Sequence, residues 1–364
     1  MILLSPPNIV LIFPRYKIDP NRVGRLEVGT ETLVDKSKST KTVLMDLFPG
    51  NTDIEGATVV NACYGGTAAL LNAVAWCESS TSNPDGRYAI VVAADIAAYA
   101  RGPARPTCGV GAVAMLVGHD APIVMSTERA THASNVWDFF KPDHTVEYPT
   151  VDGALSQVCY YRALEDVYER FADKMEKSGG GGGAGNAADS SSRSSATFDA
   201  DTPDYFVFHA PYNKLVQKSF ARLFLIDARR QYQRKKAKTG TVDEEEKKEV
   251  SCHDVDRDGE KEAGGSVSSH PLQEWLEKPI EDTYSDRALE GALKKLSAES
   301  FKRRASDANA ASKVVGNTYT ASVFLGLASL IDRVSARGEL TPGKSIVMFS
   351  YGSGALATMY RFQV

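Results

Sequence analysis

The sequence predicts an α/β fold, because short apolar strands alternate along the chain with helical segments of small and apolar residues. Three continuous apolar runs, at residues 88–94, 205–209 and 345–350, are typical of strands buried on both faces. Residues 65–79 and 320–333 carry small and apolar side chains at helical spacing. This alternation favours helices layered on sheets.

A faint internal repeat suggests two related halves. In the first half, a turn containing Cys63 opens a helix of small residues, and the strand at 88–94 follows. In the second half, a turn containing Asn317 opens a similar helix, and the strand at 345–350 follows. If the halves face each other, Cys63 and Asn317 lie at adjacent helix N-termini.

Two segments differ from the rest of the chain in composition. One is rich in glycine and serine, and the other is dense in charge. Each lacks the apolar residues that would offset the entropy of ordering it. We therefore expect an N-terminal half at 1–175, a Gly/Ser-rich insertion at 176–200, and a C-terminal half at 201–364 with a charged insertion at about 229–270.

The bulk composition limits the classes of function. Hydrophobic residues make up 43% of the 364 residues, which is enough for a sizeable core. A net charge of −4 argues against nucleic acid or a membrane surface as the main partner. Five cysteines without a CxxC pair suit a cytoplasmic protein with reduced thiols. The apolar N-terminus lacks a basic segment and contains Pro-Pro, so we expect neither a signal peptide nor an anchor.

Cys63 lies in the run Asn-Ala-Cys-Tyr-Gly-Gly-Thr, between a predicted strand at 58–60 and a predicted helix. The positive end of a helix dipole favours thiolate over thiol, which suits a nucleophile. The alternative is a buried structural cysteine, the commonest state of a free cysteine. Position alone leaves both open.

Other candidate residues follow predicted strands. His209 ends the strand at 205–209, and strand carboxyl ends border the ligand crevice in open α/β sheets. A structural histidine is the alternative. Glu31 is one of two nearby carboxylates that could act as a base. The glycines at 350–354 allow a sharp turn that presents N–H groups to an oxyanion. An Asp-rich run at 254–259 lacks the last ligand of a calcium loop, so no metal is expected.

Several longer motifs occur in a fixed order, and together they carry a resemblance to a known family. They are Gly-Arg-Leu-Glu-Val-Gly-Thr-Glu-Thr at 24–32, Asn-Ala-Cys-Tyr-Gly-Gly-Thr-Ala-Ala at 61–69, Ala-Arg-Pro-Thr at 104–107, Asp-Phe-Phe-Lys-Pro at 138–142, Phe-His-Ala-Pro-Tyr-Asn-Lys at 208–214, and the segment 349–354. The chain resembles 3-hydroxy-3-methylglutaryl-CoA (HMG-CoA) synthases over nearly its whole length outside the first dozen residues and the two insertions.

The resemblance implies a thiolase-like α-β-α-β-α arrangement of two related halves. It also implies the condensation of acetyl-CoA with acetoacetyl-CoA to HMG-CoA and CoA, a step of the mevalonate route to isoprenoids and sterols. By similarity, Cys63 accepts the acetyl group, Glu31 is the general base, and His209 positions and protonates the ketone oxygen. Backbone N–H groups at Cys63 and Ser353 are expected to bind the thioester oxyanion.

Further roles follow from the same resemblance. Lys214 and Lys218 are expected to reach coenzyme A, and active-site tyrosines are expected at Tyr64, Tyr99 and Tyr160. The substrate or coenzyme A contacts by similarity are Thr107, Ser156, Lys214, Lys218, Asn317 and Ser353. No cofactor or metal is expected beyond the coenzyme A thioesters, and the family pairs into homodimers.

The sequence also departs from the family pattern. Pro103 stands where animal members carry a substrate-contacting asparagine, and Cys108 replaces a glycine. The family has a longer region before residue 15, which includes a core strand, a helix and coenzyme A contacts. Two alternatives therefore remain: an inactive fragment, or another thiolase-fold condensing enzyme, since ketoacyl synthases use a His-Asn pair such as His209 and Asn317. The segment around Glu31 separates this last class from HMG-CoA synthases.

Overall fold

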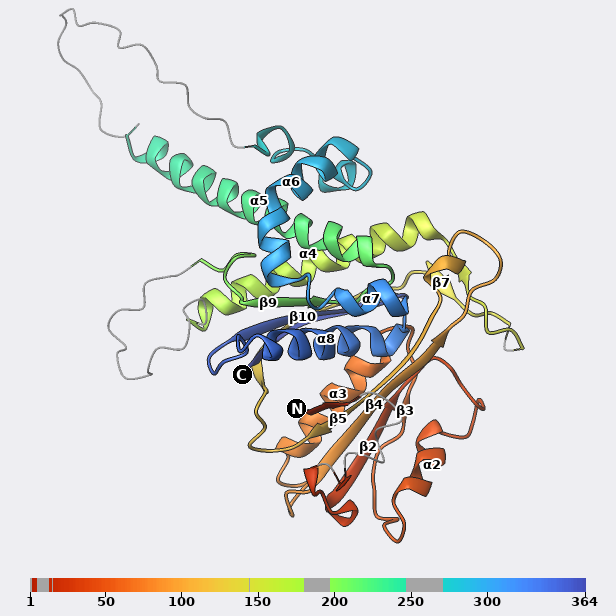
Figure 1. The fold of residues 1–364 in the computed structure, drawn as a ribbon. Coiled ribbons are helices and arrows are strands. Elements are labelled where there is room, and N and C mark those ends of the chain that lie inside the picture. The colour runs from red at the N-terminus through yellow and green to blue at the C-terminus, as the bar shows by residue number, and fades with distance from the viewer. Residues whose placement is uncertain (1, 5–12, 15, 144, 180–196, 247–270) are drawn as a thin grey trace, which may run out of the picture.

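Two mixed β-sheets form the framework of the protein (Figure 1). The computed structural model describes residues 2–4, 13–14, 16–143, 145–179, 197–246 and 271–364. The first sheet has the order β1 (Ile2–Leu4), β5 (Gly109–Val117), β4 (Tyr88–Ala97), β2 (Val23–Gly29) and β3 (Thr58–Val59). The second has the order β6 (Val124–Ala133), β11 (Leu356–Gln363), β10 (Ser345–Gly352) and β9 (Tyr205–Phe208). A small third sheet pairs β7 (Phe139–Phe140) with β8 (Thr150–Val151).

The two large sheets repeat one strand pattern. In the first, β2 and β4 are parallel, and β5 is antiparallel to both β4 and β1. In the second, β9 and β10 are parallel, and β11 is antiparallel to both β10 and β6. The strands predicted at 88–94, 205–209 and 345–350 are β4, β9 and β10. The prediction of two related halves is therefore confirmed.

Two apolar helices fill the space between the sheets. They are α3 (Gly65–Glu78) and α8 (Ser322–Ala336), and each precedes the equivalent strand of its half, β4 or β10. One buried cluster combines residues of both helices with residues of both sheets, such as Val91, Phe324 and Met348. The two helices predicted from small-residue spacing thus form the central layer.

The central layer depends on close backbone approach. A Cβ atom on Gly66 would lie 2.7 Å from the carbonyl oxygen of Thr320 and 2.9 Å from the Cβ of Ala93. A Cβ on Gly29 would lie 2.4 Å from the backbone of Gly66. Only glycine leaves room at these two positions. Strand β2 can therefore pack directly against α3, and α3 can pack directly against the second half.

The outer face of the second sheet carries two long helices, α4 (Gly153–Lys177) and α5 (Asn213–Glu246). Their apolar residues pack on β9, β10 and β11 in a second buried cluster. The helices α6 (Arg287–Arg304) and α7 (Ala310–Val315) follow α5, while the short α2 (Thr40–Leu44) lies against the first sheet. The 3-10 turns are η1 (Pro20–Arg22), η2 (Met45–Leu47), η3 (Arg105–Thr107), η4 (Gln273–Trp275), η5 (Ile280–Thr283) and η6 (Tyr319–Ala321).

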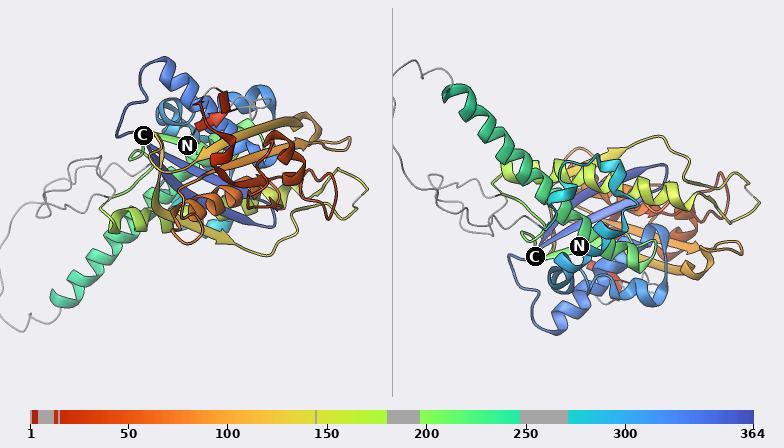
Figure 2. Two further views of the ribbon diagram at one scale, coloured as in Figure 1. Left: turned by 90° about the horizontal axis from the view of Figure 1, so that it is seen from below. Right: turned by 90° about the horizontal axis from the view of Figure 1, so that it is seen from above.

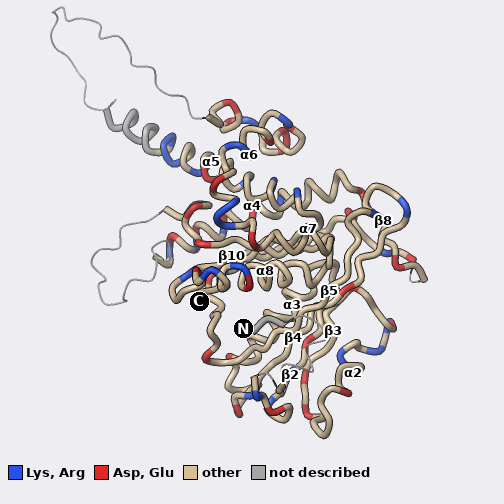
Figure 3. The backbone as a smooth tube through the Cα atoms, in the orientation of Figure 1, with Lys and Arg blue, Asp and Glu red and all other residues tan. Residues whose placement is uncertain are grey.

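Helix α5 extends into the predicted charged insertion. It runs to Glu246 and projects from the body of the protein (Figure 2), with Lys and Arg recurring along it (Figure 3). Arg230 contacts Asp173 at 2.9 Å, and Arg234 contacts Glu176 at 2.6 Å, so ion pairs attach this part of α5 to α4. The expectation that the segment from residue 229 lacks the apolar residues needed for order is therefore wrong for 229–246, where these ion pairs and good helix formers act together.

Several sequence-based expectations concern residues outside the described part of the chain. The glycine and serine run at 180–196 and the charged run at 247–270, with its Asp-rich stretch, lie there, as do most of the first twelve residues. Strand β6 and helix α4 pack with the second sheet, although β6 precedes residue 175 and α4 spans it. Within the described residues, no helix is both long and apolar enough to span a bilayer.

Replacing Gly66 by Ala tests the close packing of the central layer. The added methyl group meets the backbone of η6, so we expect a loss of about 1–3 kcal/mol in the free energy of unfolding. Gly291→Ala in α6 is the matched control, because a Cβ there meets no atom within 4 Å. The control should gain about 0.5–1 kcal/mol from helix propensity. Urea unfolding of both variants measures the difference, and equal effects would contradict the packing argument.

Candidate active site

A cavity of about 300 Å³ lies where the two halves meet. Both halves supply its walls, from the turn before α3 to the start of α4 and the residues after β9 and β10. The sequence-predicted residues that line it are Cys63, Tyr99, Thr107, Ser156, Tyr160, His209, Asn317 and Ser353. Pro103, the departure from the family pattern, also lines it, whereas Cys108 is exposed beside Thr107. Tyr64 does not line the cavity; its hydroxyl lies 2.6 Å from that of Thr358 in the core.

Cys63 occupies the turn between β3 and α3. Its φ of 58° lies in the left-handed region, which a non-glycine residue adopts at a cost of roughly 1–3 kcal/mol. The turn at Gly352 packs directly onto it, since a Cβ there would lie 1.9 Å from the carbonyl oxygen of Ala62. This turn and a hydrogen bond of 3.1 Å from the Gly65 N–H to the Asn61 carbonyl fix the strained conformation. The thiol is thereby held at the cavity wall.

The expectation that the helix terminus lowers the pKa of the Cys63 thiol is wrong. Burial raises this pKa well above its usual value, and the neighbouring Glu31 and Asp95 carboxyls raise it further. Cys63 is only 8% exposed, and α3 begins two residues after it. Desolvation and like charge therefore outweigh the dipole, and the resting residue is a thiol.

Glu31 lies directly beside Cys63, just beyond the end of β2. Its Oε1 atom accepts a hydrogen bond of 3.3 Å from the Cys63 backbone N–H and lies 4.0 Å from the Cys63 Sγ. Burial, followed by the charge of Asp95, raises the pKa of the Glu31 carboxyl to about 8. Lys141, with Nζ 3.6 Å from Oε2, acts in the opposite direction. A carboxyl with this pKa can serve as a base near neutral pH.

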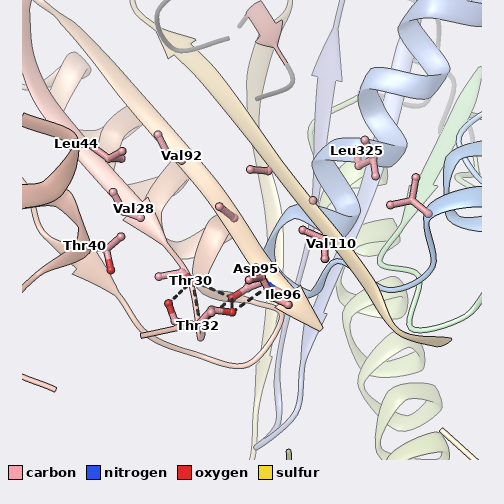
Figure 4. Close-up of a pocket in the computed structure, with 14 residues that line it drawn as sticks. Val28, Thr30, Thr32, Thr40, Leu44, Val92, Asp95, Ile96, Val110 and Leu325 are labelled. Atoms are coloured by element: carbon pink, nitrogen blue, oxygen red, sulfur yellow. Dashed lines mark hydrogen bonds between the residues drawn. The ribbon is translucent and has the colours of Figure 1, made fainter. Parts of the chain in front are cut away.

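Asp95, at the end of β4, holds the Glu31 turn in place. Six donors lie within hydrogen-bond distance of its two carboxylate oxygens: the N–H and hydroxyl groups of Thr32 and Thr320, the hydroxyl of Thr30, and the N–H of Glu31. The contacts of Thr30 and Thr32 with Asp95 are drawn in Figure 4. Asp95 was not identified from the sequence, although a carboxylate that ends a buried apolar run is a signal of a functional residue.

An apolar groove of about 510 Å³ lies behind this hydrogen-bonded cluster, on the outer face of the first sheet (Figure 4). Its walls include Val28, Val92, Ile96, Val110 and Leu325. Cys63 and His209 do not line it. The groove therefore touches the support of Glu31 but is separate from the cavity that holds the thiol.

His209 follows β9 and faces the cavity from the second half. Its backbone N–H donates to the Phe349 carbonyl at 2.8 Å, and its own carbonyl accepts from the Tyr160 hydroxyl at 2.7 Å. Burial lowers the pKa of the His209 imidazole to about 3, so the ring is neutral at physiological pH. Within the described residues, the buried Nδ1 atom has no hydrogen-bond partner. A neutral imidazole with a free ring nitrogen can bind a polar substrate atom.

Asn317 occupies the position of Cys63 in the second half. Its amide Nδ2 donates to the Tyr99 hydroxyl at 3.2 Å, and its Oδ1 accepts from the Tyr319 N–H at 3.0 Å. Its backbone N–H donates to the Thr107 carbonyl at 2.9 Å. The repeat thus brings Cys63 and Asn317 to one cavity, as the sequence predicted.

The two predicted coenzyme A lysines lie outside the cavity lining. Lys214 is exposed on the first turn of α5, next to the lining residue Leu215. Lys218 is one turn further along, where its Nζ lies 2.9 Å from Glu290. A phosphate at Lys218 therefore has to compete with this carboxylate.

Two charged residues of the motif at 138–142 were given no role from sequence. Asp138 is fully buried and accepts from the Gly354 N–H at 3.1 Å, so it ties the β7 segment to the turn after β10. Lys141 is the cation beside Glu31. Across the part of the chain that the structure describes, no group of His, Cys, Asp and Glu side chains is arranged to hold a metal ion.

Comparisons with known proteins agree over the whole chain. Residues 6–122 match the family model described as "Hydroxymethylglutaryl-coenzyme A synthase N terminal", and residues 123–268 and 253–364 match the corresponding C-terminal model. Hydroxymethylglutaryl-CoA synthase A of Dictyostelium discoideum is 44% identical over 97% of this chain, and the cytoplasmic synthase of Gallus gallus is 44% identical over 97%.

The solved structures agree with the sequence relatives. A structure titled "MvaS in complex with 3-hydroxy-3-methylglutaryl coenzyme A" matches with a TM-score of 0.71 and 26% identity, over 98% of this chain and 70% of that one. The chain spans 63% of the length of the Dictyostelium protein and 60% of the chicken protein. Two matching domain models and these relatives show that the chain belongs to the hydroxymethylglutaryl-CoA synthase family.

Proposed function

We propose that this chain condenses acetyl-CoA with acetoacetyl-CoA and water to give HMG-CoA and free CoA. The observation that carries the proposal is that the Cys63 thiol and the neutral His209 line one cavity, while the Glu31 carboxyl, which does not line it, lies 4.0 Å from the thiol. The related MvaS structure, with HMG-CoA in its title, supports the same class of ligand.

The first step transfers an acetyl group to Cys63. The sulfur attacks the thioester carbonyl of acetyl-CoA, the carbon–sulfur bond to CoA breaks, and CoA leaves with the proton of the thiol. Because the Cys63 pKa is raised, the thiol is neutral until an acyl group is present. The Cys63 N–H is bonded to Glu31 in the resting site, so its use as an oxyanion donor together with Ser353 requires that this bond be exchanged.

The second step forms the new carbon–carbon bond. Ionised Glu31 removes a proton from the acetyl methyl group, and the resulting carbanion attacks the ketone carbon of acetoacetyl-CoA. Neutral His209 donates a hydrogen bond to the ketone oxygen and protonates it as the more basic alkoxide forms. The imidazole then regains a proton from water, and Glu31 releases to water the proton that it took from the methyl group. Water then hydrolyses the Cys63 thioester and releases HMG-CoA.

The proposal also includes the residues that hold the substrates, the oligomeric state and the cellular location. Lys214 is free to approach coenzyme A phosphates at the surface, and Thr107, Ser156 and Asn317 contact the acyl part from the cavity wall. Assembly as a homodimer, a cytoplasmic setting and the division into halves at residue 175 belong to the proposal. The chicken relative is named as a cytoplasmic enzyme.

A second candidate is a ketoacyl-synthase type of condensation. It is favoured by one observation, the presence of Cys63, His209 and Asn317 on a single cavity. The two candidates differ in their need for Glu31.

Incubation with acetyl-CoA alone should add one acetyl group to Cys63. The reason is that the thiol lines the cavity while the other described cysteines do not. Peptide mass spectrometry locates the adduct. Cys77→Ala should keep it, because Cys77 lies near the C-terminal end of α3, buried in the core and away from the cavity. Folded, soluble protein without an adduct on Cys63 would contradict the proposal.

Glu31→Ala should reduce the rate of condensation by at least about a hundredfold, while Cys63 is still acetylated. Removing the carboxylate takes away the base, and it also lowers the pKa of the thiol, whose ionisation Glu31 opposes. Rapid-quench assays of the two steps measure this separately. Condensation that survives in Glu31→Ala would favour the ketoacyl-synthase type.

Condensation from preformed acetyl-enzyme should rise with pH and reach half its maximum near pH 8, where Glu31 ionises. The pKa of Glu31 is raised, so the active base is the minor form at neutral pH, and the rate falls about tenfold per unit well below the pKa. Single-turnover rates from pH 6 to 9.5 measure the profile. A rate that stays constant between pH 6 and 9.5 would contradict a raised Glu31 pKa.

A further inference from the structure

Lys141 has an unusual set of neighbours at the edge of the active site. Its Nζ atom lies 3.6 Å from Glu31 Oε2, 3.6 Å from Glu147 Oε2, and 5.5 Å from the centre of the Tyr319 ring. The side chain is 19% exposed. Glu31 and Tyr319 are buried, whereas Glu147 is largely exposed. The ammonium therefore lies between the buried base and the protein surface.

The segment that carries Lys141 is fixed by several contacts. Lys141 directly follows β7, which pairs with β8. At the other end of β7, the buried Asp138 accepts from the Gly354 N–H and the Tyr351 hydroxyl, and its carbonyl accepts from the Asp152 N–H. The position of the ammonium is thus set by the second half of the protein, and its approach to Glu31 does not depend on a free loop.

The charges around Glu31 are otherwise unfavourable to an ionised carboxylate. The groups that face it are Asp95, the Cys63 thiol and the phenols of Tyr99 and Tyr319. Each of these is neutral or negative. Among the described residues, Lys141 is the only cation within ion-pair distance of Glu31. Without it, only the hydrogen bond from the Cys63 N–H would oppose the effect of burial and Asp95 on the Glu31 pKa.

The contacts also fix the orientation of the carboxylate. Oε1 accepts from the Cys63 N–H, and Oε2 faces the Lys141 ammonium, so each oxygen has its own partner. The Lys141 Nζ atom is buried. Within the described residues it has no hydrogen-bond partner, and its contacts with the Glu31 and Glu147 carboxylates are ion pairs of 3.6 Å. The Tyr319 ring partly replaces water around the charge.

We propose that Lys141 is a positioning residue that keeps Glu31 ionised and oriented for proton removal from the acetyl methyl group, and that Glu147 moderates it from the surface. The inference rests on the proposed function, in which Glu31 is the base. Lys141 does not touch the reacting atoms. It acts by setting the fraction of Glu31 that is charged at a given pH.

The test compares Lys141→Met with Lys141→Arg and Glu147→Gln. In single-turnover condensation from preformed acetyl-enzyme, we expect the rising limb of the pH profile to move by about one unit or more to higher pH in K141M. At pH 7 this corresponds to a loss of about tenfold. K141R should restore most of the profile, because it keeps the charge. E147Q should move the limb slightly to lower pH, because a competing carboxylate is removed.

A purely structural role for Lys141 predicts a different result. The rate would then fall equally at every pH, and a K141M profile that is parallel to that of the wild type would overturn the inference. Thermal unfolding checks that the variants fold. Should K141M not fold, K141Q gives the same comparison with a polar head in the buried space.

A measurement without turnover separates this inference from the proposed function. Infrared difference spectra against pH follow the Glu31 carboxyl, with Glu31→Gln identifying its band. A Glu31 pKa that is higher in K141M than in the wild type supports the inference even if no condensation is detected, and an unchanged pKa overturns it. Failure of condensation in the wild type, with this shift present, counts against the proposed function alone.

Discussion

The buried carboxylate of Asp95 is the interaction on which the site depends. Its Oδ1 atom accepts hydrogen bonds from residues 30–32, in the turn after β2. Its Oδ2 atom accepts from the N–H and hydroxyl of Thr320 in η6, directly before α8. A charge that is only 3% exposed is tolerable because all its acceptor positions are used. Hydrogen bonds to a charged group contribute about 1.5–3 kcal/mol each. One side chain therefore joins the two halves and orients Glu31.

The same side chain shapes the electrostatics of the cavity. Asp95 raises the pKa of both Glu31 and Cys63, in each case after burial as the larger cause. His209 is neutral for the opposite reason, since burial disfavours its charged form. The resting site thus holds a neutral thiol and a neutral imidazole beside a carboxyl whose pKa is raised to about 8. The thiol and the imidazole therefore gain charge only during the reaction, which is the condition under which preorganised dipoles act most strongly.

The sequence predicted the fold class, the strands β4, β9 and β10, and the central helices, because buried runs and small-residue spacing are local signals. The repeat and the family motifs also predicted that Cys63, His209 and Asn317 belong to one site. The sequence did not predict the raised pKa of Cys63, since desolvation depends on what covers the thiol. Asp95 and Lys141 were passed over because their partners lie far away in the chain. The extension of α5 was missed because its ion pairs to Asp173 and Glu176 come from another helix.

The duplicated strand order has a consequence for how such a sequence can vary. The two copies have diverged at one matched point, where the first carries the cysteine and the second an asparagine, yet they share a single carboxylate at their junction. Asp95 and Thr320 are separated by 225 positions and are bonded directly. A substitution at either residue therefore alters the hydrogen bonds between the two copies, so we expect these two positions to change together or not at all.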